Sequence, residues 1–262
     1  MERHAVDSEI LTEADGGIFT VTLNRPAKMN SITPEMHLAL AAAFDAFAAD
    51  DTLHVAIVTG AGERAFCAGS DLSRFSPNGS YPATGYAGLA QRHDLAKPVI
   101  AAVNGICLGG GFELALSCDI VVASEKAVFG LPEPKVGLIA IGGGIHRLVR
   151  QAGLKRAMEP LLTGRNIPAG EAFAMGLVSE LAAPGMEMAA ARRIAGQVIA
   201  NAPLAVRLSK ELAMWGLDQP TLADALSGQS GHPSFAAWRA AEDTAEGPKA
   251  FAEKRQAEWK GR

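Results

Sequence analysis

The sequence contains few of the residues that mark several classes of protein. Of its 262 residues only 3 are cysteine and 6% are aromatic. Cys67, Cys107 and Cys118 are odd in number and show neither C-x-x-C nor metal-ligand spacing, so we expect buried free thiols and no metal site. No cluster of Lys and Arg is present and the formal net charge is -4. With so few aromatic rings, this charge excludes a nucleic-acid-binding surface.

Long apolar runs are also missing. The longest uncharged stretch, 98–112, is interrupted by Asn104 and several glycines. It is shorter than the roughly 18 to 20 residues that a membrane-spanning helix needs. The first ten residues, MERHAVDSEI, lack the basic-then-apolar order of a signal peptide. These features favour a cytoplasmic protein that does not cross a membrane.

The composition that is present, 48% hydrophobic and 20% charged, is that of an ordinary globular protein. Alternating residues around the turn DGG at 15–17 predict two short strands at the start of the chain. The sequence TPE at 33–35 marks the start of a helix that we expect to end near Asp50. Its apolar residues recur at helical spacing and predict a buried face: Met36, Leu40, Phe44 and Phe47.

Strands alternate with helices in the first half of the chain, and helices dominate from about residue 142. The pattern predicts buried strands at 54–59, 99–103, 120–123 and 127–129, and helices at 145–152, 185–199, 204–215 and 236–254. The segment 73–88 has little periodicity and is expected to be a loop that covers a site. This order predicts an α/β core followed by a helical module.

Two glycine-containing segments are the first candidates for a functional site. The segment FCAGSDL at 66–72 ends a predicted strand in small residues, and NGICLGGGFELA at 104–115 places three glycines before a helix. Free N–H groups at a helix N-terminus favour negative charge, so this segment indicates an anion or oxyanion site. The alternative is that the glycines only allow close packing of the backbone.

Two acids are candidates for proton transfer, and each has a plainer interpretation. Glu113 lies in the first turn after the glycines, where an acid is also a routine partner of the helix dipole. Glu133 lies before Pro134, which is expected to hold its backbone extended so that the side chain is aimed in one direction. The plainer interpretation of Glu133 is a solvated loop acid.

A G-x-G-x-x-A pattern at 60–65 does not open a helix, so nicotinamide binding is not favoured. No histidine stands out as a base, and we expect the histidines on the surface or on helix faces. The motifs of serine hydrolases, phosphate loops and zinc proteases are absent.

Five segments taken in order resemble the crotonase superfamily, specifically enoyl-CoA hydratases. They are NRP at 24–26, FCAGSDL at 66–72, KPVIAAVNGICLGGGFELALSCDI at 97–120, FGLPEPKVGL at 129–138 and EGPKAFAEKR at 246–255. The resemblance covers nearly the whole chain. It implies an α/β fold, a spiral of β-β-α units with an acyl-CoA site, over residues 1–195. Residues 196–262 would form a helical trimerisation region that closes the CoA site, in a homotrimer or a dimer of trimers.

The resemblance also gives the candidate residues their roles. The backbone N–H groups of Ser70 and Gly110 would form an oxyanion hole for the thioester oxygen of an acyl-CoA. Ser70 replaces the commoner Ala or Gly, which keeps the backbone donor and adds a hydroxyl near the acyl chain. Glu113 would deprotonate the attacking water, and Glu133 would protonate the α-carbon. The resemblance places five residues at the CoA or substrate: Lys28, Ala68, Asp71, Leu72 and, from a neighbouring subunit, Lys254.

The implied activity is the reversible addition of water to a 2-enoyl-CoA thioester, by default in fatty acid metabolism. Coenzyme A is part of the substrate, and no separate cofactor is implied. One alternative is an isomerase of the same fold, for which Glu133 alone suffices. A second alternative is an acyl-CoA-binding subunit with little catalytic activity, in which both acids are structural.

Overall fold

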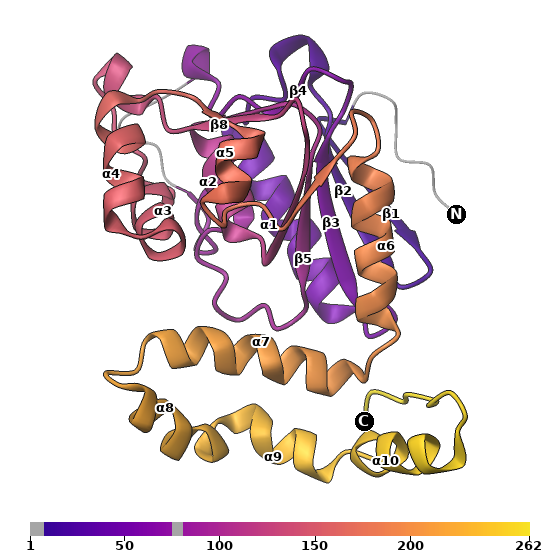
Figure 1. The fold of residues 1–262 in the computed structure, drawn as a ribbon. Coiled ribbons are helices and arrows are strands. Elements are labelled where there is room, and N and C mark those ends of the chain that lie inside the picture. The colour runs from indigo at the N-terminus through magenta and orange to yellow at the C-terminus, as the bar shows by residue number, and fades with distance from the viewer. Residues whose placement is uncertain (1–7, 75–80) are drawn as a thin grey trace.

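Two β-sheets form the centre of the computed structural model, which describes residues 8–74 and 81–262 (Figure 1). The larger sheet has the strand order β1-β2-β3-β5-β7-β10, and the smaller one β4-β6-β8-β9. The β1–β2 and β8–β9 pairs are antiparallel, and the other pairs are parallel. The strands are β1 (Ile10–Asp15), β2 (Ile18–Leu23), β3 (Val55–Gly60), β4 (Ala65–Cys67), β5 (Val99–Val103), β6 (Ile106–Leu108), β7 (Ile120–Ser124), β8 (Val128–Gly130), β9 (Ile167–Pro168) and β10 (Glu180–Ala182).

Ten α-helices surround these sheets or extend from them in the described part of the chain. They are α1 (Pro34–Ala49), α2 (Gly110–Ser117), α3 (Gly144–Ala152), α4 (Leu154–Thr163), α5 (Ala169–Ala174), α6 (Glu187–Ile199), α7 (Pro203–Leu217), α8 (Leu222–Gly228), α9 (Pro233–Ala240) and α10 (Asp243–Glu253). The predicted N-terminal hairpin, first helix and four buried strands are confirmed within one or two residues. Residues 75–80 of the expected loop at 73–88 lie outside the described residues, while Leu72–Arg74 and Tyr86–Gly88 form single 3-10 turns.

The single helix predicted at 236–254 is wrong, because the chain forms α9 and α10 there with a break at Ala241. Ala241 has an extended backbone, and the Thr244 hydroxyl donates to the Trp238 carbonyl at 2.6 Å. The Asp243 carboxylate accepts from the backbone N–H groups of Lys260 and Gly261, each at 2.8 Å. These contacts with the end of the chain redirect the helix, and the local hydropathy pattern does not contain them.

Helix α1 follows its sequence closely. The Thr33 side chain accepts a hydrogen bond from the Met36 N–H, which caps the first turn. The four apolar residues predicted to form its buried face are at most 1% exposed. At the other end, the Lys97 ammonium group donates to the carbonyl oxygens of Phe47 and Asp50 at 2.8 and 2.7 Å. This buried lysine therefore satisfies carbonyls that a helix C-terminus leaves free.

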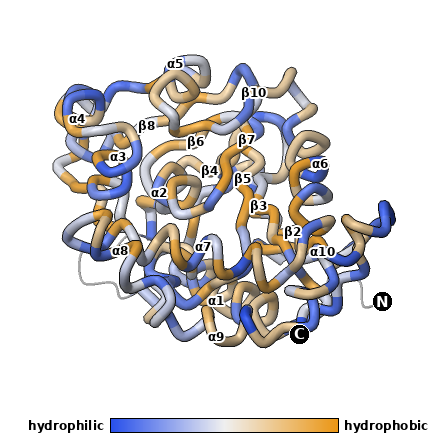
Figure 2. Tube along the Cα trace, turned by 60° about the horizontal axis from the view of Figure 1, so that its bottom comes forward, coloured by the Kyte–Doolittle hydropathy of each residue, from blue (hydrophilic) through white to orange (hydrophobic). Residues whose placement is uncertain are grey.

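The central strands of the larger sheet are hydrophobic along most of their length (Figure 2), and their side chains are buried on both faces. In β3, Ala56 and Val58 join the main core, whereas Val55 and Ile57 face a second core beneath α6. Helix α6 contacts β3, β5 and β7 on that side. Cover on both faces is what a buried parallel sheet requires, and it explains why these strands are continuous apolar runs.

Helices α7–α10 form a separate layer below the α/β body in the view of Figure 1. The Lys210 ammonium group on α7 joins the two parts, donating to the Lys97 carbonyl at 3.0 Å and to the Asp119 carboxylate at 2.7 Å. Helix α6 continues to Ile199 and packs on the sheet, so the expected boundary at 195/196 falls inside it. None of the described helices combines the length and apolar character needed to cross a membrane.

Candidate active site

An isolated parallel bridge pairs Ser70 with Ile32 and directs the backbone N–H of Ser70 away from the segment that contains Ile32. The Ile32 N–H donates to the Gly69 carbonyl at 2.8 Å, and the Asp71 N–H donates to the Ile32 carbonyl at 2.9 Å. Peptide groups alternate in direction along an extended chain, so the N–H of Ser70 points to the opposite side. A Cβ placed on Gly69 would lie 3.3 Å from the Gly110 nitrogen, which shows how closely the two glycine segments approach.

Gly110 begins helix α2 and supplies the second amide. Gly109, with φ of 53°, turns the chain from β6 into the helix, and its carbonyl accepts from the N–H groups of Phe112 and Glu113. The N–H groups of Gly110 and Gly111 therefore belong to the free first turn, at the positive end of the helix dipole. A Cβ on Gly111 would lie 2.2 Å from the Cys67 carbonyl oxygen, so only glycine lets α2 rest against β4.

Glu113 projects from the first turn of α2 and is only 3% exposed. Its Oε1 accepts a hydrogen bond from the Gly144 N–H at 2.9 Å. Burial raises the pKa of Glu113 to about 7, and the nearby charge of Glu133 adds to the rise, while the Gly144 hydrogen bond opposes it. A buried carboxyl that gains or loses its proton near neutral pH is suited to general acid–base chemistry.

Glu133 begins the 3-10 turn Glu133–Val136, and its carboxyl group lies against the glycine turn. Its Oε1 is 3.2 Å from the position that a Cβ on Gly109 would take. Its Oε2 is buried and has no hydrogen-bond partner among the described residues, and burial raises the pKa of this acid. The expected extended conformation of Glu133 is wrong, because the residue begins a 3-10 turn, and the interpretation as a solvated loop acid is wrong because Oε2 is buried. The structure brings both acids to the two backbone donors.

Four of the five residues predicted at the CoA or substrate lie on or beside the segment that carries Ser70. The Ala68 N–H donates to the Met29 carbonyl at 3.0 Å, which places the turn containing Lys28 beside residues 66–72. Lys28 and Ala68 are exposed, and Leu72 is 59% exposed. Asp71 differs, because its carboxylate accepts hydrogen bonds from the Ser73 hydroxyl and from Arg25, which hold its pKa below the usual range.

Lys254, the fifth of these residues, lies in the helical layer. It follows α10 with φ of 54° and is exposed. Helix α10 is far from α2 within the same chain, as Figure 1 shows. The structure therefore does not bring Lys254 to the site formed by its own chain. Its predicted contact with CoA bound to a neighbouring subunit stays a prediction.

Sequence analysis missed Tyr86 and His37, which both pack at the site. The Tyr86 hydroxyl lies 3.1 Å from the Ser70 Oγ, and a Cβ on Gly110 would lie 2.0 Å from the Tyr86 oxygen. His37, which was expected on the surface or on a helix face, lies on the buried face of α1 and is 6% exposed, and its Nδ1 accepts from the Ala87 N–H at 2.9 Å. Tyr86 belongs to an aperiodic segment, which gives no sequence signal for this contact.

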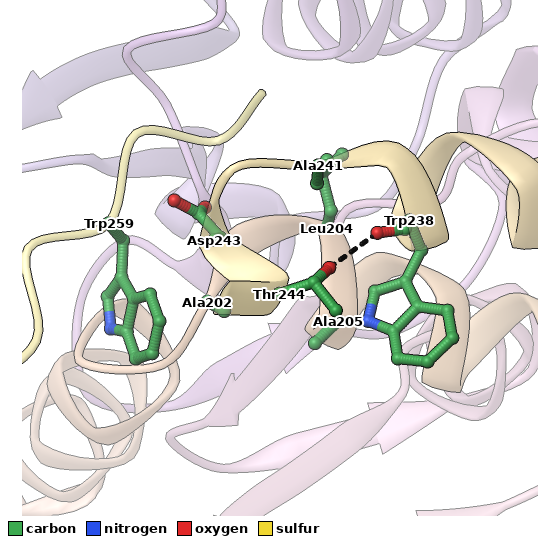
Figure 3. Close-up of a pocket in the computed structure, with 8 residues that line it drawn as sticks. All are labelled: Ala202, Leu204, Ala205, Trp238, Ala241, Asp243, Thr244 and Trp259. Atoms are coloured by element: carbon green, nitrogen blue, oxygen red, sulfur yellow. Dashed lines mark hydrogen bonds between the residues drawn. The ribbon is translucent and has the colours of Figure 1, made fainter. Parts of the chain in front are cut away.

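A cavity of about 190 Å³ lies apart from the two acids, between α7 and the C-terminal segment (Figure 3). Trp238 and Trp259 flank it. The polar side chains of Asp243 and Thr244 are engaged by the backbone contacts described above. This cavity therefore belongs to the packing of the C-terminal segment and contains neither of the two candidate acids.

Comparisons with known proteins agree with this geometry. The profile of the enoyl-CoA hydratase/isomerase family matches residues 13–262. A carnitinyl-CoA dehydratase from Salmonella arizonae is 41% identical over 252 residues, which cover 94% of this chain and 96% of that protein. Crystal structures of enoyl-CoA hydratases from Mycobacterium marinum and Mycobacterium tuberculosis superpose with TM-scores of 0.91 and 0.90. They are 40% and 39% identical and cover 97% of this chain and 99% of each of theirs.

These similarities confirm the predicted crotonase-like fold and the prediction of an enzyme of the hydro-lyase class. The match extends through α7–α10, so the helical layer is part of the shared fold. The chain belongs to the enoyl-CoA hydratase/isomerase family, also called the crotonase family.

Proposed function

We propose that the protein adds water reversibly across the 2,3 double bond of a 2-enoyl-CoA thioester. The observation that carries this proposal is the pairing of two buried carboxyl groups with two backbone amides at one place. Attack of water on the β-carbon moves negative charge onto the thioester oxygen, where the amides of Ser70 and Gly110 stabilise it. Coenzyme A is bound as part of the substrate, so the reaction uses no separate cofactor.

Glu113 and Glu133 take different parts in this reaction. Ionised Glu113 accepts a proton from water as the oxygen bonds to the β-carbon, and the π electrons of the double bond move towards the thioester. Burial raises the pKa of Glu133, and in its protonated form this acid then donates a proton to the α-carbon. Glu113 ends protonated and Glu133 ionised, and proton exchange with solvent restores both. Dehydration is the same sequence reversed, and the name of the Salmonella relative describes that direction.

The decisive experiment follows the ultraviolet absorbance of crotonyl-CoA, which falls as its conjugated double bond is hydrated. Wild type, Glu113→Gln and Glu133→Gln are compared, with Glu13→Gln as a control because Glu13 is an exposed carboxylate on β1. We expect a rapid fall in wild type and the control, and losses of about 10²- to 10⁴-fold in either site variant.

Two results would contradict the hydratase proposal. The first is the absence of turnover by wild type on crotonyl-CoA and on longer or branched 2-enoyl-CoA thioesters, which would favour the binding-subunit alternative. The second is full turnover by Glu113→Gln together with conversion of 3-enoyl to 2-enoyl thioesters, which would favour the isomerase.

We further propose that the helical layer α7–α10, which makes up most of the expected trimerisation region 196–262, mediates trimer assembly. Large apolar side chains remain exposed there: Phe251 on α10 is 88% exposed and Leu217 on α7 is 71% exposed. Lys254 directly follows α10, the helix that carries Phe251, and would reach the CoA of a neighbouring subunit. Light scattering should give the mass of a trimer or hexamer, and Phe251→Glu should lower it. A monomeric wild type would contradict this assembly.

The expected cytoplasmic location and the role in fatty acid metabolism stay predictions.

A further inference from the structure

Two hydroxyl groups meet at the candidate oxyanion hole. The Ser70 Oγ and the Tyr86 hydroxyl oxygen are 3.1 Å apart, and the Tyr86 oxygen also packs directly on Gly110. Tyr86 is 3% exposed, whereas Ser70 is only partly buried. The pair therefore touches both residues whose amides would bind the thioester oxygen. Neither role proposed above requires a hydroxyl at these positions.

The two hydroxyl groups together carry one more proton than the hydrogen bond between them requires. Two hydroxyls carry two protons, and the single hydrogen bond between them uses one. Burial raises the pKa of Tyr86 well above its usual value, so the phenol stays protonated. A phenol is more acidic than an alcohol and is the stronger donor of the two. Tyr86 therefore donates to the Ser70 Oγ, and the Ser70 proton remains available on the more exposed side of the pair.

We propose that the Ser70 hydroxyl is a third donor to the thioester oxygen, polarised by the hydrogen bond from Tyr86. This inference rests on the proposed hydratase function. The amide nitrogen and Oγ of one serine are separated by only two carbons, so both can donate to a single acceptor. A hydroxyl that accepts one hydrogen bond donates a stronger second one, because bonded hydroxyls polarise each other. Ser70 would thus be a catalytic residue through its side chain, and Tyr86 a positioning residue.

The segment that carries Tyr86 has an unusual backbone. Gly85, Ala87 and Gly88 have φ angles of 79°, 52° and 65°. At Ala87 this left-handed conformation is unfavourable by about 1 to 2 kcal/mol, and a Cβ on Gly88 would lie 2.3 Å from the Ala41 nitrogen. Surrounding contacts must therefore hold the segment in this conformation. Backbone strain of this kind is found most often at functional sites.

His37 provides one of these contacts. Its Nδ1 accepts the Ala87 N–H at 2.9 Å, which requires an unprotonated nitrogen. Burial lowers the pKa of His37 to about 4, so the imidazole is neutral near pH 7. The His37 and Tyr86 rings also meet edge to face, with centroids 4.6 Å apart. The backbone strain and this histidine together fix the Tyr86 hydroxyl beside Ser70.

The test measures crotonyl-CoA hydration by Ser70→Ala, Tyr86→Phe and the double variant. Ser70→Ala keeps the backbone amide and should lower kcat about three- to tenfold with KM little changed, as expected for one hydrogen bond. Tyr86→Phe should lower kcat less, and the double variant should be no slower than Ser70→Ala, because the two hydroxyls act as one unit. Thr59→Val is the control, since it removes a buried hydroxyl that donates to the Ala102 carbonyl in the central sheet. It should lower Tm without a selective loss of kcat.

A spectroscopic measurement separates catalysis from folding. Cinnamoyl-CoA bound to Glu113→Gln reports polarisation of the thioester carbonyl as a red shift of its absorbance. Adding Ser70→Ala should reduce this shift. The proposal is overturned by values of kcat within twofold of wild type in Ser70→Ala, by fully additive losses in the double variant, by an effect on KM alone, or by an unchanged red shift. A wild type without enoyl-CoA turnover would instead overturn the proposed function.

Discussion

Replacing Glu113 by glutamine should stabilise the fold while nearly abolishing hydration. Glu113 is buried, and its carboxylate form is disfavoured by the loss of solvent and by the charge of Glu133. Glutamine has nearly the same shape, carries no charge, and can still accept the hydrogen bond from the Gly144 N–H. The variant therefore keeps the packing of the site and removes only the cost of ionising a buried acid.

The size of this effect depends on pH in a defined way. The pKa of Glu113 is raised from its ordinary 4.5 to about 7, so the folded protein holds this proton more tightly than the unfolded chain. The contribution of Glu113 to the free energy of unfolding is fully present below pH 4.5 and falls as the pH rises to about 7. Above pH 7 it no longer changes. At 1.36 kcal/mol per pH unit the full difference is on the order of 3 kcal/mol, and about 2.5 kcal/mol of it develops between pH 5 and pH 8.

Thermal unfolding of wild type, Glu113→Gln and the surface control Glu13→Gln between pH 5 and pH 8 tests this reasoning. The free-energy difference corresponds to a gap in Tm between Glu113→Gln and wild type that widens by about 5 to 10 °C over this range. The gap for Glu13→Gln should stay nearly constant. A Tm gap for Glu113→Gln that does not change with pH, or that shrinks as pH rises, would refute the claim that the ionised acid is destabilising.

Three further predictions concern activity and packing. Hydration measured as kcat/KM should follow a bell-shaped pH profile, because Glu113 must be ionised to accept the proton of water while Glu133 must be protonated to donate one; a profile without an acid limb would contradict the role of Glu113 as base. Gly111→Ala should lower the free energy of unfolding in urea by about 1 to 3 kcal/mol, because the new Cβ would lie 2.2 Å from the Cys67 carbonyl oxygen; a neutral result would mean that α2 can shift freely. Lys97→Met should lower it by about 2 to 3 kcal/mol, since it removes a charged donor from two carbonyls at the end of α1; unchanged stability in urea would show that water replaces the lysine.

The regions predicted well from the sequence are those in which local pattern and tertiary packing agree. The TPE start of α1 and its apolar spacing are local signals. The buried strands could be predicted from continuous apolar runs, and these runs occur because both faces of the sheet are covered. The three free cysteines are buried, as expected from their spacing. Glu113 was a candidate because it lies in the first turn after a glycine motif, and the resemblance rather than this position gave it a catalytic role; the structure gives it a buried position beside Glu133.

What the sequence did not reveal depends on contacts between distant segments. The break between α9 and α10 accompanies hydrogen bonds from the end of the chain to Asp243. The place of Tyr86 depends on a backbone with left-handed residues that no periodicity encodes, and on His37, which lies 50 positions away from Ala87. A histidine on a helix and a tyrosine in an irregular segment show their relation only after folding.

The proposed donors are main-chain amides, and this has a consequence for how the protein can evolve. The amides of Ser70 and Gly110 are directed by the bridge to Ile32 and by the start of α2, not by a side chain. A change of the Ser70 side chain removes the donor that its hydroxyl would add but leaves the amide in place. Selection can therefore change the side chains around the acyl group while the two backbone donors are inherited with the fold.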